Sequence, residues 1–183
     1  IYITKNEFVE YLNQIKTLVV EKHQSLYADE IDLLINKFNV FGFHFATLDI
    51  RQNSKIHRQV FKDIISHVPE IFPENYEQLD EVEKIEILSK VKANLQEYDF
   101  DDEMTKATIS SIKAVKTIQD KNGELGCNRY IISNNESALN VMETLSMFHL
   151  TGWENPSVDI VPLFESVDDL IHADQVMERL YTN

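Results

Sequence analysis

Apolar side chains recur three and four residues apart over most of the chain, which is the spacing of one face of an α-helix. Thr4 with Glu7, and Asp80 with Glu83, form capping-box patterns that mark two helix starts. Ser54 is a candidate N-cap for a further helix. The spacing predicts about seven helices, over residues 8–19, 27–38, 56–65, 82–91, 104–118, 137–148 and 167–180.

Three short apolar runs interrupt the helical spacing and predict strands. They cover residues 41–50, 130–133 and 158–164. The first run is too short for a good helix and too continuous for a strand with one wet face, so we expect a strand buried on both faces. Because helices separate the strands, we expect parallel pairing through crossover connections. The predicted fold is helix-rich α/β, and its three strands leave edges that other chain or a second copy would have to cover.

The charge balance narrows the possible partners. The chain of 183 residues carries 17 basic and 31 acidic side chains, a formal net charge of -14. It has no basic stripe, so we expect neither a nucleic-acid partner nor an anionic membrane partner. No apolar run approaches the roughly 20 residues that span a bilayer, and no export signal is visible. The single cysteine, Cys127, excludes an internal disulfide, and the cytoplasm is the expected compartment.

The predicted strands place two charged side chains where α/β enzymes build their sites. Side chains alternate across a strand, so Thr47, Asp49 and Arg51 share one face, and Leu163 and Glu165 share another. If both faces look into one barrel, Arg51 and Glu165 meet at its carboxyl-end mouth.

Each of these two side chains has a functional and a structural interpretation. Glu165 offers a carboxylate of the kind that binds Mg²⁺, but an exposed helix cap is the alternative. Arg51 offers a planar fork for phosphate or carboxylate oxygens, and its alternative is an ion pair with Asp49 or another acid.

Other candidate chemistry is weaker. The six histidines lack the repeated spacing of a zinc site, and packing or surface roles are expected for them. His44 is expected to pack within the first strand, and Cys127 to be a small buried apolar side chain. The acidic run at residues 99–103 is interpreted as a helix N-terminus rather than a calcium site. Four glycines cannot supply a phosphate loop or a dinucleotide fingerprint.

Three ordered sequence blocks resemble phosphoenolpyruvate carboxylase, from about Ile31 onward. The blocks are Phe41-Gly42 leading into Leu48-Asp49-Ile50-Arg51-Gln52 and Ser54, then Tyr130-Ile131-Ile132-Ser133, then Val161-Pro162-Leu163-Phe164-Glu165 with Asp168-Asp169-Leu170. The resemblance implies part of a TIM-type (β/α)8 barrel. It also implies a cytoplasmic homotetramer that joins phosphoenolpyruvate and bicarbonate to give oxaloacetate and phosphate with Mg²⁺ or Mn²⁺.

The resemblance also implies roles for three residues. Glu165 would be one of two carboxylate metal ligands, Leu163 would line the pocket around the substrate methylene, and Arg51 would face the substrate anions. Thr47 and Asn53 differ from the arginine and glutamate common at these positions, so contacts made by those groups are in doubt. Asn134-Asn135-Glu136 also departs from the usual continuation of the second block.

The family's histidine motif, second metal carboxylate, catalytic lysine and glycine-rich loop have no counterpart in this sequence. We therefore expect residues 1–183 to be a single fragment of the catalytic domain, with 1–40 as a helical lead-in and 41–183 as a partial barrel. The isolated fragment is expected to be inactive and to bind Mg²⁺ weakly. The alternatives are a non-catalytic helix-rich interaction or scaffold module, and a different metal-dependent enzyme acting on a phosphorylated enol.

Overall fold

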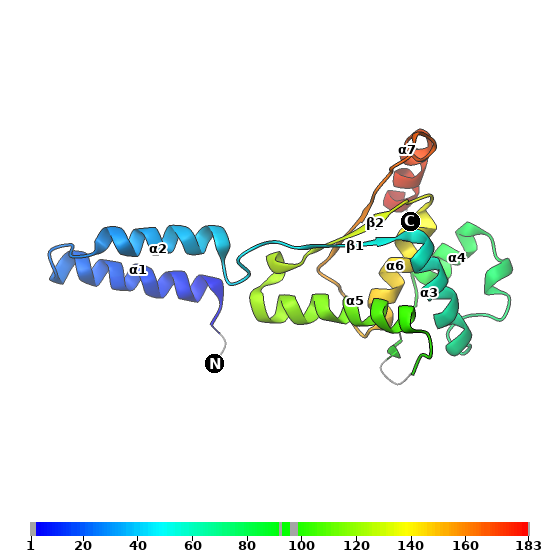
Figure 1. The fold of residues 1–183 in the computed structure, drawn as a ribbon, viewed down its shortest axis with the longest axis horizontal. Coiled ribbons are helices and arrows are strands. Elements are labelled where there is room, and N and C mark those ends of the chain that lie inside the picture. The colour runs from blue at the N-terminus through cyan, green and yellow to red at the C-terminus, as the bar shows by residue number, and fades with distance from the viewer. Residues whose placement is uncertain (1–2, 92, 96–98, 183) are drawn as a thin grey trace.

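The computed structural model describes residues 3–91, 93–95 and 99–182, and within them the fold is helix-rich α/β (Figure 1). A hairpin of two helices stands apart from a larger body built around a small sheet. The elements are α1 (Lys5–Lys22), α2 (Ala28–Phe41), β1 (Asp49–Asn53), α3 (Ser54–His67), η1 (Tyr76–Gln78), α4 (Glu81–Leu88), α5 (Glu103–Asn122), η3 (Glu124–Gly126), β2 (Arg129–Ser133), α6 (Ala138–Leu150), β3 (Asp159–Pro162) and α7 (Val167–Thr182). Seven α-helices and three strands therefore match the numbers expected from the sequence, over the residues that are described.

The sheet has the order β1-β2-β3 and both pairings are parallel, as predicted. Arg51 lies opposite Ile131, which lies opposite Val161, so these three side chains point to one face of the sheet. That face is the more exposed one, and we call it the open face. The neighbouring residues along each strand point to the other face, which α3, α5 and α6 cover. They are Ile50, Tyr130, Ile132 and Ile160.

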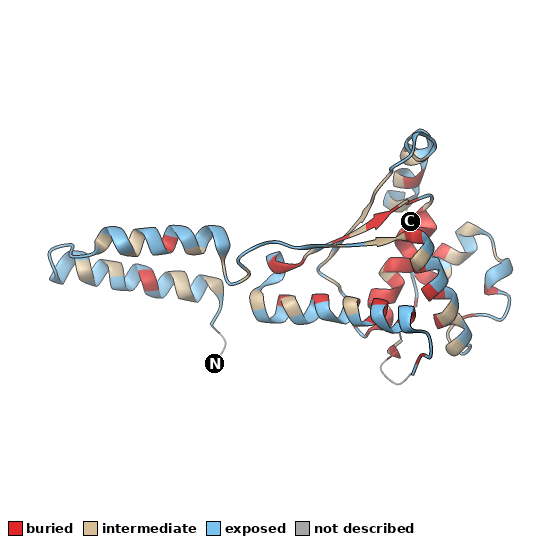
Figure 2. Ribbon diagram, in the orientation of Figure 1, coloured by how far each residue is buried: buried red, intermediate tan, exposed pale blue. Residues whose placement is uncertain are grey.

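The hydrophobic core surrounds α6 (Figure 2). Eleven of the thirteen residues of α6 are buried, because α3, α4 and α5 pack around it while the sheet closes another side. Met147, Phe148 and Leu150 are completely buried there. A helix buried on nearly all sides has no strongly polar face, which is why its apolar positions are more continuous than a surface helix requires.

The helices α1 and α2 confirm the two predicted at the start of the chain. The capping box at Thr4 and Glu7 begins α1, with the Thr4 side chain 3.2 Å from the Glu7 amide. Phe8 and Phe38 join the two helices through ring centroids 4.5 Å apart. Only Leu12 and Ile35 are buried among the residues of these helices, and several large apolar side chains, including Leu18 and Leu34, are exposed.

The prediction of a strand buried on both faces at residues 41–50 is wrong. The helix α2 continues to Phe41, Gly42 and Phe45 adopt φ values of 54° and 61°, and β1 begins only at Asp49. The first residue of the run, Phe41, continues the helical spacing of α2 and belongs to that helix. The positive φ values of Gly42 and Phe45 are incompatible with an extended strand after it. Leu48 is 61% exposed, and His44 lies in this connection rather than in a strand.

The predicted cap of α3 is displaced by one residue. Asn53, not Ser54, is the N-cap, because its side chain accepts a hydrogen bond of 2.9 Å from the Lys55 amide. The predicted capping box at Asp80 and Glu83 is confirmed as the start of α4.

Candidate active site

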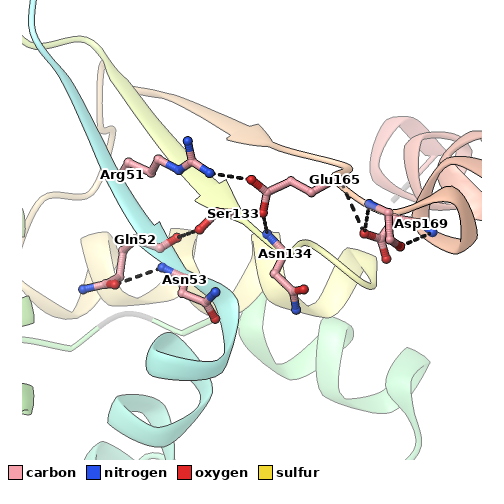
Figure 3. A network of polar contacts seen from close by, with 8 residues as sticks. Arg51, Gln52, Asn53, Ser133, Asn134, Glu165 and Asp169 are labelled. Carbon is pink, nitrogen blue, oxygen red and sulfur yellow. Dashed lines mark hydrogen bonds and ion pairs between the residues drawn. The ribbon is translucent and has the colours of Figure 1, made fainter.

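Arg51 and Glu165 meet at the carboxyl ends of the strands (Figure 3). Arg51 lies in β1, and Glu165 follows β3 after two further residues. The Nη2 atom of Arg51 donates a hydrogen bond to Oε1 of Glu165, and the two side chains are 56% and 41% exposed. The two groups that strand alternation placed at one edge of the sheet do lie together there, although 114 residues separate them in the sequence.

The end of β2 holds the second oxygen of Glu165. The backbone N–H of Asn134 donates to Oε2 of Glu165 at 2.9 Å, while the Asn134 carbonyl accepts a hydrogen bond from the Ser54 hydroxyl. Asn134 adopts a φ of 53°, a left-handed conformation that asparagine tolerates better than most residues. All three strand ends are thus joined around the Glu165 carboxylate. Ser54, which is not the N-cap of α3, instead bonds the backbone of Asn134.

The backbone at Glu165 is held by the start of α7. Asp169 Oδ2 accepts hydrogen bonds from the Ser166 amide at 2.9 Å and the Glu165 amide at 3.3 Å, and the Ser166 hydroxyl accepts one from the Asp169 amide at 3.0 Å. The backbone N–H of Ser166 stabilises the ionised form and lowers the pKa of Asp169. Asp169 was not predicted to hold the backbone at Glu165. Ser166 and Asp169 nevertheless stand three residues apart, in the pattern of a capping box.

Leu163 follows β3 directly and stands two residues before Glu165. It is half-buried, its amide donates to the Ile132 carbonyl at 2.9 Å, and its carbonyl accepts from the Asn135 amide at 3.2 Å. These bonds continue the pairing of β3 with β2 past the end of the strand. The Leu163 side chain is therefore carried by a backbone that is anchored on both sides.

Asp49 is not the partner of Arg51. Asp49 pairs with Arg129 through a contact of 3.0 Å at the amino ends of β1 and β2. The open face therefore has one ion pair at each end of the strands, and Arg51 pairs with the other acid, Glu165.

Glu165 is the carboxylate that this arrangement offers to a divalent metal. Both oxygens of Glu165 accept hydrogen bonds, but a carboxylate has about four lone-pair directions, so it can still bind a cation. Among the described residues no group of three or more His, Cys, Asp or Glu side chains is arranged to hold a metal ion. Glu165 fits the role of a single ligand to a hard cation that takes its other oxygens from water, substrate or residues elsewhere.

A buried polar network supports the other face of the sheet. His57 of α3 forms hydrogen bonds with the Tyr130 hydroxyl at 2.9 Å and the Thr144 hydroxyl at 3.2 Å. Burial lowers the pKa of His57 to about 4 and raises the pKa of Tyr130 to about 12, so both are uncharged near neutral pH. This agrees with the packing or surface role expected of the histidines. Cys127 is also buried, as predicted, and burial raises its pKa.

An arginine and a carboxylate joined at the carboxyl edge of parallel strands define an α/β protein with its candidate site at the strand ends. A sequence model of the phosphoenolpyruvate carboxylase family matches residues 1–183, and the chain belongs to this family.

Similar curated proteins agree with the family match. The chain is 32% identical to a phosphoenolpyruvate carboxylase of Prochlorococcus marinus strain MIT 9515 over 98% of its own length. It is 30% identical to one of a Synechococcus strain and 31% identical to one of a Synechocystis strain, in each case over 99% of its length. The chain spans about a fifth of the length of these relatives, 19% of the first and 18% of the other two. In the part of the chain that is described, no helix is long and apolar enough to cross a membrane.

Proposed function

We propose that this chain is part of a phosphoenolpyruvate carboxylase, which joins phosphoenolpyruvate and bicarbonate to give oxaloacetate and phosphate. The observation that carries the proposal is the contact of Arg51 with Glu165 on the open face. Family membership over the whole chain supports the reaction, and the guanidinium of Arg51 suits substrates that are all anions.

Three side chains receive roles in this proposal. Glu165 is one carboxylate ligand of a divalent metal, Mg²⁺ or Mn²⁺, which would stabilise negative charge on the enolate oxygen of the substrate. Arg51 turns its planar donors toward phosphate or carboxylate oxygens, and its exposure leaves donors available besides the one that bonds Glu165. Leu163 packs against the substrate methylene and excludes water from it.

The strands belong, in this proposal, to a partial (β/α)8 barrel whose interior is the open face. One face of the sheet is covered by helices and the other carries the candidate site, as a barrel strand requires. Residues 41–183 contribute this segment, and residues 1–40 are a helical lead-in. The proposal assigns the remaining strands and the second metal carboxylate to chain outside these residues. It assigns the assembly into a cytoplasmic homotetramer to the complete enzyme.

A non-catalytic interaction module is the second candidate. The exposed apolar side chains of α1 and α2, including Tyr11 at 54% and Leu18 at 55%, favour it because such a surface suits another protein. An interaction module would need neither Arg51 nor Glu165.

The proposal predicts that protein expressed from the complete reading frame releases phosphate from phosphoenolpyruvate only when bicarbonate and a divalent metal are present. The 183-residue chain alone should form no oxaloacetate, because the proposal assigns it one of two metal carboxylates and its described residues form a sheet of three strands. Coupled assays of oxaloacetate and phosphate measure both. Release of phosphate without bicarbonate would indicate a different enzyme of phosphorylated enols. Absence of activity from the complete protein would favour the interaction module.

A further inference from the structure

A cavity lies among the helices on the covered side of the sheet, away from the open face. It has a volume of about 170 Å³ and lies between α3, η1, α4 and α6. This is smaller than the roughly 300–1,000 Å³ typical of sites for drug-sized ligands, so only a small molecule or ion would fit. Its polar lining residues are Arg58, Lys62, Tyr76, Glu77, Lys84 and Glu143.

Two buried polar groups in this cavity lack partners. The hydroxyl of Tyr76 and the Oε2 atom of Glu143 have no hydrogen bond within the described chain, although the two residues are only 2% and 4% exposed. Leaving one such group unsatisfied costs about 1–3 kcal/mol. Both residues line this cavity, where a polar occupant would supply the hydrogen-bond partners that the two groups lack.

Cations surround the same space. Arg58 and Lys62 project from α3, and Lys84 projects from α4. The opposing acid at the rim, Glu77, lies 4.0 Å from the Lys62 ammonium, and its backbone carbonyl accepts a hydrogen bond of 3.1 Å from Lys84. Three cations and one rim carboxylate leave an excess of positive charge in a chain that is otherwise strongly acidic.

Glu143 cancels this excess only in part near neutral pH. Burial raises its pKa to about 7, and the nearby Arg58, Lys84 and Lys62 oppose that rise only in part. A protonated Glu143 carries a hydroxyl that can donate a hydrogen bond. Burial and the charges of Glu143 and Glu77 also raise the pKa of Tyr76, so the Tyr76 hydroxyl is a second donor.

We propose that this cavity binds a small tetrahedral dianion, of the size of inorganic phosphate or sulfate, between the cations of α3 and α4 and the hydroxyl groups of Tyr76 and Glu143. Arg58 supplies a planar pair of donors and the two lysines supply point charges, a combination suited to a tetrahedral oxyanion. The site is separate from Arg51 and Glu165, and it does not depend on the function proposed above.

Sulfate is the probe, because its charge does not change near neutral pH. Isothermal titration calorimetry of the protein from its complete reading frame should show a sulfate site that weakens at least about tenfold in Arg58→Gln or Lys84→Gln. Lys55→Gln, which removes an exposed cation of α3 outside the cavity, should leave sulfate affinity unchanged. Because each variant is compared with the wild type, sulfate bound elsewhere does not contribute to the difference.

The pH dependence of binding provides a second readout. Glu143 ionises as the pH passes about 7, so sulfate should bind more weakly at about pH 8 than at about pH 6, by at most about tenfold. In Glu143→Gln this difference should disappear while binding persists. Sulfate affinity that Arg58→Gln and Lys84→Gln leave unchanged would overturn the proposal. If Glu143→Gln does not fold, the variants of the exposed Arg58 and the half-buried Lys84 still decide it.

Discussion

Replacing Arg51 by lysine will lower kcat/KM for phosphoenolpyruvate by about two to three orders of magnitude in protein expressed from the complete reading frame. Lysine keeps the positive charge but loses the planar fork, so it cannot bond Glu165 and a substrate oxygen in the same geometry. Steady-state kinetics at saturating bicarbonate and metal measure the loss. A fall in kcat as well as a rise in KM is expected, because in the proposed function the guanidinium stabilises negative charge that develops on the substrate in the transition state.

Arg129 provides the matched control. It points to the same open face as Arg51 and also pairs with a carboxylate, that of Asp49 at 3.0 Å, but it lies at the amino ends of the strands. Arg129→Lys should therefore change kcat/KM less than about threefold. Equal losses for the two variants would show that arginines on this face act through stability or net charge rather than through position.

The second large effect concerns stability. Replacing His57 by glutamine will remove about 2 kcal/mol of the stability that the 183-residue chain gains between about pH 5 and about pH 7.5. The folded-state pKa of His57 is lowered from 6.5 to about 4, so between these values the unfolded state binds more protons and stability rises with pH. Glutamine can keep hydrogen bonds to Tyr130 and Thr144 without titrating. Urea unfolding at the two pH values measures the difference.

Glu143 should act in the opposite direction. Its pKa is raised from 4.5 to about 7, so its contribution to stability is present below pH 4.5 and is lost as the pH rises through about 7. In the wild type, the ionisation of Glu143 opposes the rise of stability with pH that His57 causes. Glu143→Gln should therefore make this rise steeper, whereas His57→Gln should remove it. Parallel pH profiles for the wild type and both variants would contradict the assignment of these two buried groups.

The sequence allowed the candidate site to be predicted better than the first strand. Strand alternation is local and regular, so the positions of Arg51 and Glu165 relative to β1 and β3 could be counted along the chain. Parallel pairing in register then brings them together. The strand at residues 41–50 was predicted wrongly because an apolar run alone does not show whether an adjacent strand is available to pair with it. Here α2 and the positive φ of Gly42 decide the conformation instead.

The supporting residues could not be placed from composition or periodicity. The contact of Asn134 with Glu165 depends on a left-handed backbone at the end of β2, and the contact of Ser54 with Asn134 joins residues 80 positions apart. The cavity at Glu143 likewise forms where four elements meet, and a glutamate on a predicted helix gives no sign of being buried. The pattern at Ser166 and Asp169 was visible in the sequence and could have been interpreted as a helix start.

In the proposed function Glu165 and Arg51 act together at the strand ends, where the carboxylate binds the metal beside the guanidinium. A crystal structure of the complete protein with Mn²⁺, phased on its anomalous signal, tests this most directly. The account predicts an anomalous peak at about 2.0–2.3 Å from a Glu165 carboxylate oxygen, on the open face beside Arg51. A well-occupied manganese site elsewhere, with Glu165 bonded only to Arg51 and Asn134, would contradict it.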